Sequence, residues 1–97
     1  MNLYARESNE LQAVTVSVDE VPLGVDDLDD VELMVTTSRE RPSATVAGVW
    51  MAPVVLGAKY GVMTEGPTRG PGTYLIWYHA ISAPEDVVEA AGSFRIT

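Results

Sequence analysis

The stretch "GTYLIWYHA", residues 72–80, decides how this chain folds. Its dense β-branched and aromatic content is typical of a β-strand. Successive side chains of a strand point to opposite faces, so the residues divide into two sets. One set is Tyr74, Ile76, Tyr78 and Ala80, and the other is Leu75, Trp77 and His79, followed by Ile81. Both sets are largely apolar, whereas an exposed antiparallel sheet is normally apolar on one face only.

The second apolar face of this strand requires a cover. Gly-Thr-Tyr at the strand start is similar to the tyrosine corner of immunoglobulin-like sandwiches, which would turn Tyr74 inward. Leu75, Trp77 and His79 would then point outward. Either a loop of the same chain covers them or another molecule does, and we favour the second reading because an outward Trp beside a Leu is typical of a protein contact. On that reading Trp77→Ser would leave folding intact and abolish attachment.

The rest of the chain also alternates with period two, the pattern of half-buried strands. Further strands are predicted at residues 11–18, 31–38, 44–52, 57–64 and 92–97. Turn-forming residues separate them, including the loops at 21–30, 39–43 and 65–72. Residues 83–90 suit a loop or a hairpin arm, with one helical turn as the weaker alternative.

Short strands separated by turns every 8 to 12 residues predict an all-β fold: a single immunoglobulin-like β-sandwich of about seven strands, with a small barrel as the competitor. One domain is expected to span residues 1–97, with residues 1–10 forming an edge strand or a docking arm that carries Leu3 and Tyr4. The predicted core is Val14, Val16, Val18, Val31, Leu33, Val35, Val46, Trp50, Tyr60, Val62, Tyr74, Ile76, Tyr78, Phe94 and Ile96.

The composition narrows the classes of function. A net charge of −8 opposes binding to nucleic acid and to anionic membrane surfaces. The chain has no cysteine, so disulfides and thiolate metal sites are excluded and a reducing compartment is expected. The first residues lack the apolar core of a signal peptide, and no run reaches the length of a membrane span.

Three motifs contain residues that could catalyse a reaction or bind a ligand. His79 has no evident nucleophile and orienting acid, so we expect no catalytic residues. Residues 19–32 hold seven acids and no base, which favours a solvated loop, with docking on a basic partner or a cation site as the alternatives. Residues 66–72 lack the Lys-Ser/Thr of a phosphate loop, so we expect no cofactor there, but Arg69 could pair with an acid of another subunit.

The second half carries a recurring set of motifs: "VW" at 49–50, "KYGVMTEGP" at 59–67, "GPGTYLIWYHAISAPEDVV" at 70–88 and "AGSFRIT" at 91–97. In this order they resemble small immunoglobulin-like virion proteins of tailed bacteriophages, especially those of actinobacteria. In that family the outward positions corresponding to Leu75 and His79 are often charged, so this chain departs from the pattern there.

The resemblance implies a non-enzymatic structural protein of the virion, assembled in the host cytoplasm. It would be an accessory or decoration protein on the capsid or the head–tail neck, present as a homo-oligomer or in many copies. The expected interface residues are Leu75, Trp77, His79, Ile81, Arg69, Leu3 and Tyr4. The alternative is a carbohydrate- or receptor-binding module whose exposed aromatic residues, Trp77 among them, line a groove.

Overall fold

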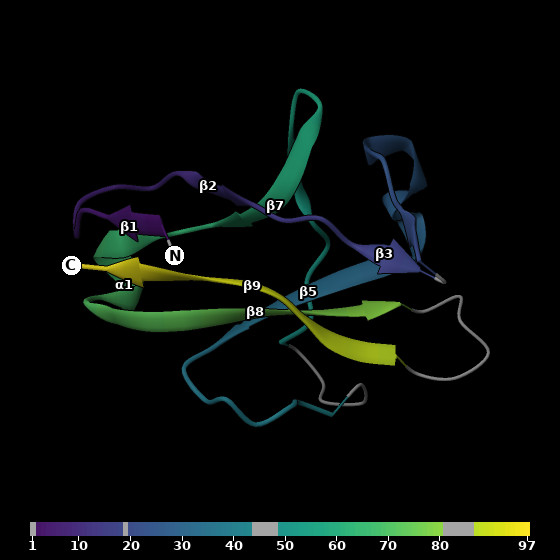
Figure 1. Cartoon of the computed structure of the whole chain (residues 1–97). Helices are drawn as coiled ribbons and strands as arrows, with labels where there is room; N and C mark the ends of the chain where they lie inside the picture. The colour runs from purple at the N-terminus through teal and green to yellow at the C-terminus, as the bar shows by residue number, and fades with distance from the viewer. Residues whose placement is uncertain (1, 19, 44–48, 81–86) are drawn as a thin grey trace.

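The computed structural model describes residues 2–18, 20–43, 49–80 and 87–97, although not the side chains of residues 18, 29, 30 and 87. These residues form a mostly-β domain in which two sheets pack together as a sandwich (Figure 1). The predicted β-sandwich architecture is therefore confirmed, and the sheets are separate rather than closed into a barrel.

The larger sheet has four strands in the order β1–β9–β8–β5. Strand β1 (Asn2–Tyr4) lies parallel to β9 (Val87–Ile96), and β8 (Gly72–Ala80) is antiparallel to both β9 and β5 (Val31–Thr36). The ladder between β8 and β9 shifts register between Ile76 and Trp77, where a β-bulge lies. Of the two roles predicted for the N-terminal residues, the structure shows an edge strand.

The smaller sheet has three antiparallel strands in the order β2–β7–β6. They are β2 (Leu11–Ala13), β7 (Lys59–Met63) and β6 (Val54–Leu56). Gly61 in β7 is required here because a Cβ atom would collide with the backbone carbonyl of Gln12 in β2. Strands β3 (Ser17–Val18) and β4 (Val21–Pro22) make a separate short ribbon.

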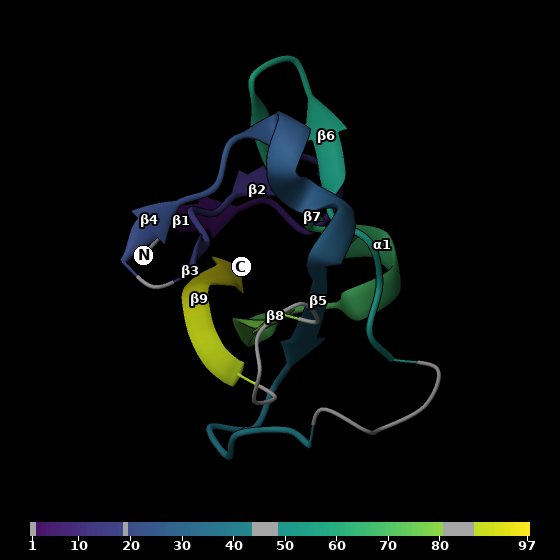
Figure 2. The same cartoon turned by 90° about the vertical axis from the view of Figure 1, so that its right-hand side faces the viewer.

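Two short helical segments complete the described fold. The 3₁₀-helix η1 (Val25–Asp30) precedes β5, and the single turn α1 (Gly66–Arg69) lies between β7 and β8 (Figure 2). Loops are expected from the sequence at both places, so these helical turns are a difference from the prediction. Consecutive acids with Gly24 before them suit a tight 3₁₀ turn, and Pro67 suits the first turn of a helix because its missing N–H needs no partner there.

The core lies between the two sheets and contains most of the predicted residues. Its buried members are Val16, Leu28, Val31, Leu33, Tyr60, Val62, Tyr74, Ile76, Tyr78, Phe94 and Ile96. Val14 and Val35 pack against this cluster while partly exposed. Trp50 was expected here but packs against a second cluster on the far side of the larger sheet. Val46 and the side chain of Val18 lie outside the described residues.

The largest error of the sequence analysis concerns residues 44–52, which were predicted as a strand. In the described part, residues 49–52 form only a single bridge, between Met51 and Leu33 of β5. Pro53 cannot donate to a ladder, and the chain crosses there to the other sheet and forms β6. The predicted strand over 11–18 is also interrupted at residues 14–16. Residues 87–90 belong to β9, antiparallel to β8, which agrees with the hairpin arm expected over 83–90, while residues 83–86 lie outside the described part.

Candidate interaction surface

The outer face of β8 is covered by the chain itself. Trp77 is 6% exposed and forms a small apolar cluster with Met34 of β5 and Val88 of β9. Trp50 and Leu75, both half-buried, pack against this cluster. Of the two covers considered for this face, a segment of the same chain is therefore the one present.

Both tryptophans on this face have hydrogen-bond partners for their indole N–H groups. The indole N–H of Trp77 donates to the hydroxyl of Thr36 over 2.9 Å, and that of Trp50 donates to the carbonyl of Ser43 over 3.1 Å. The ring of Trp50 lies 5.6 Å from that of His79, which is 6% exposed. The expectation that Trp77 and His79 face an external partner is wrong, because both are buried and Trp50 packs against them on this face.

The other predicted interface residues do not gather on one surface. Leu3 is 65% exposed, whereas Tyr4 is half-buried with its ring edge-on to Phe94, 6.1 Å between centroids. Arg69 forms an ion pair with Glu65 of its own chain, 3.1 Å, and lies over the ring of Tyr74. Ile81 lies outside the described residues. The predicted set therefore does not make a continuous contact surface.

The titratable side chains of the described residues include one close histidine–carboxylate pair. Nδ1 of His79 lies 3.4 Å from a carboxylate oxygen of Glu32, its cross-strand neighbour. Asp26 and Asp27 in η1 are exposed to solvent. Among the residues that the structure describes, no group of three or more His, Asp or Glu side chains is placed to hold a metal ion.

The described surface does contain one concentration of exposed apolar side chains. Seven large apolar residues of the described chain are exposed, and five of them fall within residues 49–56. We call these five the apolar edge: Val49, Met51, Val54, Val55 and Leu56. Their exposed fractions run from 37% for Val54 to 56% for Leu56. Clustered exposed apolar residues, unlike scattered ones, indicate an interaction site.

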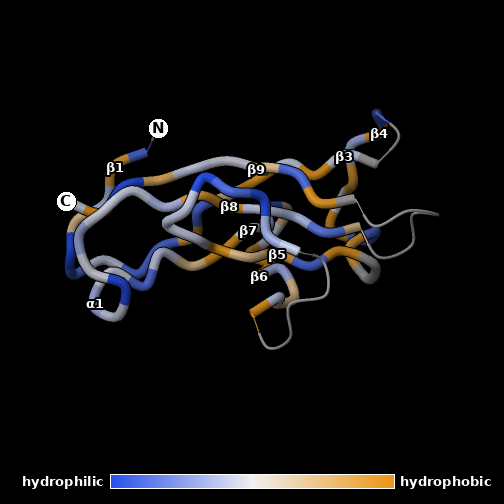
Figure 3. Tube along the Cα trace, turned by 90° about the horizontal axis from the view of Figure 1, so that it is seen from below, coloured by the Kyte–Doolittle hydropathy of each residue, from blue (hydrophilic) through white to orange (hydrophobic). Residues whose placement is uncertain are grey.

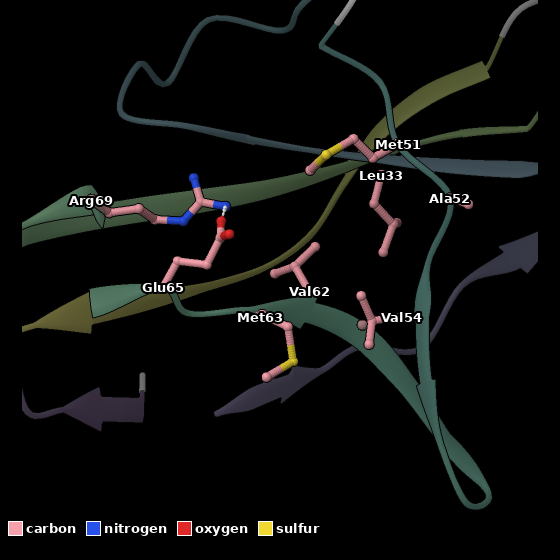
Figure 4. Close-up of a pocket in the computed structure, with 9 residues that line it drawn as sticks. Leu33, Met51, Ala52, Val54, Val62, Met63, Glu65 and Arg69 are labelled. Atoms are coloured by element: carbon pink, nitrogen blue, oxygen red, sulfur yellow. Dashed lines mark hydrogen bonds and ion pairs between the residues drawn. The ribbon is translucent and has the colours of Figure 1, made fainter. Parts of the chain in front are cut away.

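Two hollows flank the apolar edge where the chain crosses between the sheets. The first, about 150 Å³, lies between Leu33 and Met51 on one side and Val54 and Val62 on the other, with the Arg69–Glu65 ion pair at its end (Figure 4). The second lies between η1 and β6 and is lined by Leu28, Val31, Glu32, Pro53 and Val55.

The sequence contained a signal for this surface that the strand analysis missed. "VWMAPVVLGA", residues 49–58, has no charged residue in a chain that is 21% charged. A proline beside such a run marks an edge strand. The segment around α1, another connection between strands, is by contrast mostly hydrophilic (Figure 3).

No family model, curated protein or solved structure matches the chain. Within the described ranges, no helix is long and apolar enough to cross a membrane.

Proposed function

We propose that the protein is a non-enzymatic structural component that acts by protein–protein contact, as an accessory or decoration protein attached to the capsid or the head–tail neck of a phage particle. The observation that carries the contact role is the apolar edge. The assignment to a virion rests on the motif resemblance in the sequence.

We further propose that the sandwich is immunoglobulin-like. The sheet orders β1–β9–β8–β5 and β2–β7–β6 support this, since they correspond to the strand orders A′GFC and BED of that architecture. A second support is Tyr74, at the start of β8, whose hydroxyl donates back to the carbonyl of Arg69 over 2.6 Å. A tyrosine at the start of strand F makes such a bond in immunoglobulin-like domains.

The apolar edge would supply adhesion. Complete burial of one Val, Leu or Met side chain contributes about 1.5–3 kcal/mol, and these five are already about half buried, so the edge offers roughly 5 kcal/mol in total. Association costs a comparable amount or more in lost rotational and translational freedom. A single contact would therefore be weak, and stable attachment would need many copies on one particle.

The acidic segment, residues 19–32, would select where the protein docks. Glu20, Asp26 and Asp27 are exposed, and Glu32 lines the hollow beside β6. With a net charge of −8, the chain would approach basic surfaces faster than acidic ones. Basic patches on the outside of a protein shell fit this requirement.

The test is to purify particles of the phage that encodes the chain and to measure the chain by quantitative mass spectrometry. We expect a fixed stoichiometry relative to a capsid or neck protein. Recombinant chain should rebind particles that lack it, and Met51→Lys should weaken rebinding, while Leu3→Lys, at a more exposed position on β1, should not. Absence of the chain from purified particles would refute the proposal.

The alternative, a carbohydrate-binding module, has no structural observation in its favour. It requires aromatic rings on an open surface, but Trp77 is buried and Trp50 is half-buried against the cluster that contains it.

A further inference from the structure

Strand β6 is the open edge of the smaller sheet. In the described chain its single neighbour is β7, with Val54 opposite Gly61, Val55 opposite Tyr60 and Leu56 opposite Lys59. The turn that joins the two strands has Gly57 at its first central position with a φ of +64°, as a II′ hairpin turn requires. Figures 1 and 2 show this hairpin projecting beyond the body of the domain.

The ladder register determines which backbone groups of β6 are free. In a hairpin with a two-residue turn the residues next to the turn exchange hydrogen bonds, and the next pair does not. Leu56 and Lys59 are therefore the bonded pair, and the N–H and C=O of Val55 point away from β7, toward the open edge. Val55 presents a donor and an acceptor side by side to any strand that adds to this sheet.

Edge strands are normally kept from pairing with another chain by short length, proline, bulges or charged side chains. Strand β6 is short, with three residues, and follows Pro53, but it carries no charge: residues 49–58 hold no charged residue. Residues 49–63, which include the whole hairpin, contain Lys59 and no acid. They carry a charge of +1 in a chain of net charge −8, so the paired strands themselves place no acid against an acid, although Glu32 and Glu65 line the hollows on either side.

We propose that a second copy of this chain covers β6. Two β6 strands pair antiparallel around a two-fold axis at Val55, whose N–H and C=O bond reciprocally to those of Val55 in the partner. Val54 of one copy then lies opposite Leu56 of the other. The smaller sheets join into one sheet of six strands, and the pairing is closed because an isologous contact uses the same edge of both copies.

This inference rests on the proposed function, because both use the apolar edge. It assigns Val54, Val55 and Leu56 of the apolar edge to a second copy, so the adhesion of the edge is divided between two contacts. Val49, Met51 and the acids of residues 19–32 remain for the contact with the particle.

The experiment is sedimentation equilibrium of the full chain over a range of protein concentrations, together with amide hydrogen exchange. We expect a monomer–dimer equilibrium, with the Val55 amide protected from exchange only in the dimer. Val55→Pro removes the outward N–H, a substitution that the open side of an edge strand tolerates, and should lower the association constant at least about tenfold. Val55→Lys, which keeps the N–H and introduces a charge, should do the same.

Val21→Lys is the matched control, because Val21 is 60% exposed on the separate β3–β4 ribbon; it should leave the dimer unchanged. A chain that remains monomeric at all concentrations, or a dimer that both Val55 variants leave intact, would overturn the pairing. A monomer that still binds particles would refute this inference and keep the proposed function. A β6 dimer that is absent from particles would support this inference and refute the proposed function.

Discussion

The indole N–H of Trp77 donates to the hydroxyl of Thr36, 2.9 Å away, on the side of the larger sheet that faces away from the sandwich core. Thr36 is the last residue of β5, where the chain leaves the sheet. The hydrogen bond thus ties the aromatic residue of β8 to the start of the segment that covers it. Trp77 is a core residue of a second, smaller apolar cluster.

Replacing Trp77 by Ser is therefore expected to destabilise the fold. Removal of a large buried aromatic side chain costs about 3–5 kcal/mol, a large share of the stability of a domain of this size. Urea unfolding followed by circular dichroism measures the loss. Leu3→Ser, at a position 65% exposed, should change stability by less than about 0.5 kcal/mol. An unchanged unfolding midpoint for Trp77→Ser would show that the outer face is open.

The Thr36 hydroxyl can be tested separately from packing. Thr36→Val keeps the shape of the side chain but leaves the indole N–H of Trp77 without its acceptor, which should cost about 1–3 kcal/mol. Thr36→Ser retains the hydroxyl and should cost less. Equal losses for the two variants, measured by denaturant unfolding, would mean that the hydrogen bond contributes nothing.

The hydroxyl of Tyr74 donates to the carbonyl of Arg69 and lies 2.9 Å from that of Gly70, while its ring stacks on Phe94 with 5.3 Å between centroids. Tyr74→Phe keeps the stacking and should cost about 1 kcal/mol. Tyr74→Leu loses both interactions and should cost more. If Tyr74→Phe left the free energy of unfolding unchanged in denaturant unfolding, the bond between α1 and β8 would contribute nothing to stability.

Stability is expected to fall at high pH because of Tyr78. Burial raises the pKa of its phenol above the ordinary value of 10.0, and the hydrogen bond donated to Glu89 and the charge of that carboxylate act in the same direction. The native state then keeps a proton that the unfolded state loses, so the stabilisation is complete below about pH 10 and is lost as the pH rises through the higher native pKa. Unfolding measured from neutral to alkaline pH should show this decline, and Tyr78→Phe should make it shallower. An identical pH profile in Tyr78→Phe would contradict the assignment.

Close approach of two backbones makes Gly61 hard to replace. In Gly61→Ala the added methyl group meets the carbonyl of Gln12, so β2 and β7 must separate, at a cost of at least about 2 kcal/mol. Gly24→Ala is the control, since the nearest atom to its Cβ would be 3.8 Å away. Comparable thermal unfolding of the two variants would show that the sheet adjusts without cost.

The sequence by itself determined the β architecture and most of the core. Strict alternation places Tyr74, Ile76 and Tyr78 on one face, and such a pattern needs no knowledge of neighbouring strands. The same alternation also showed that β8 carries apolar side chains on both faces, so that both faces have to be buried from solvent. The acidic, cysteine-free composition likewise follows from counting residues.

Only the tertiary structure decided what covers the second face and which surface stays exposed. Trp50 and Trp77 are far apart in sequence, and alternation shows which side a residue points to without showing what lies on that side. Trp50 packs on the outer face of β8, where Trp77 and His79 are buried, whereas the five residues of the apolar edge stay exposed. The physical reason is that burial depends on contacts between distant segments, whereas a strand pattern reports only the direction of each side chain from its own backbone.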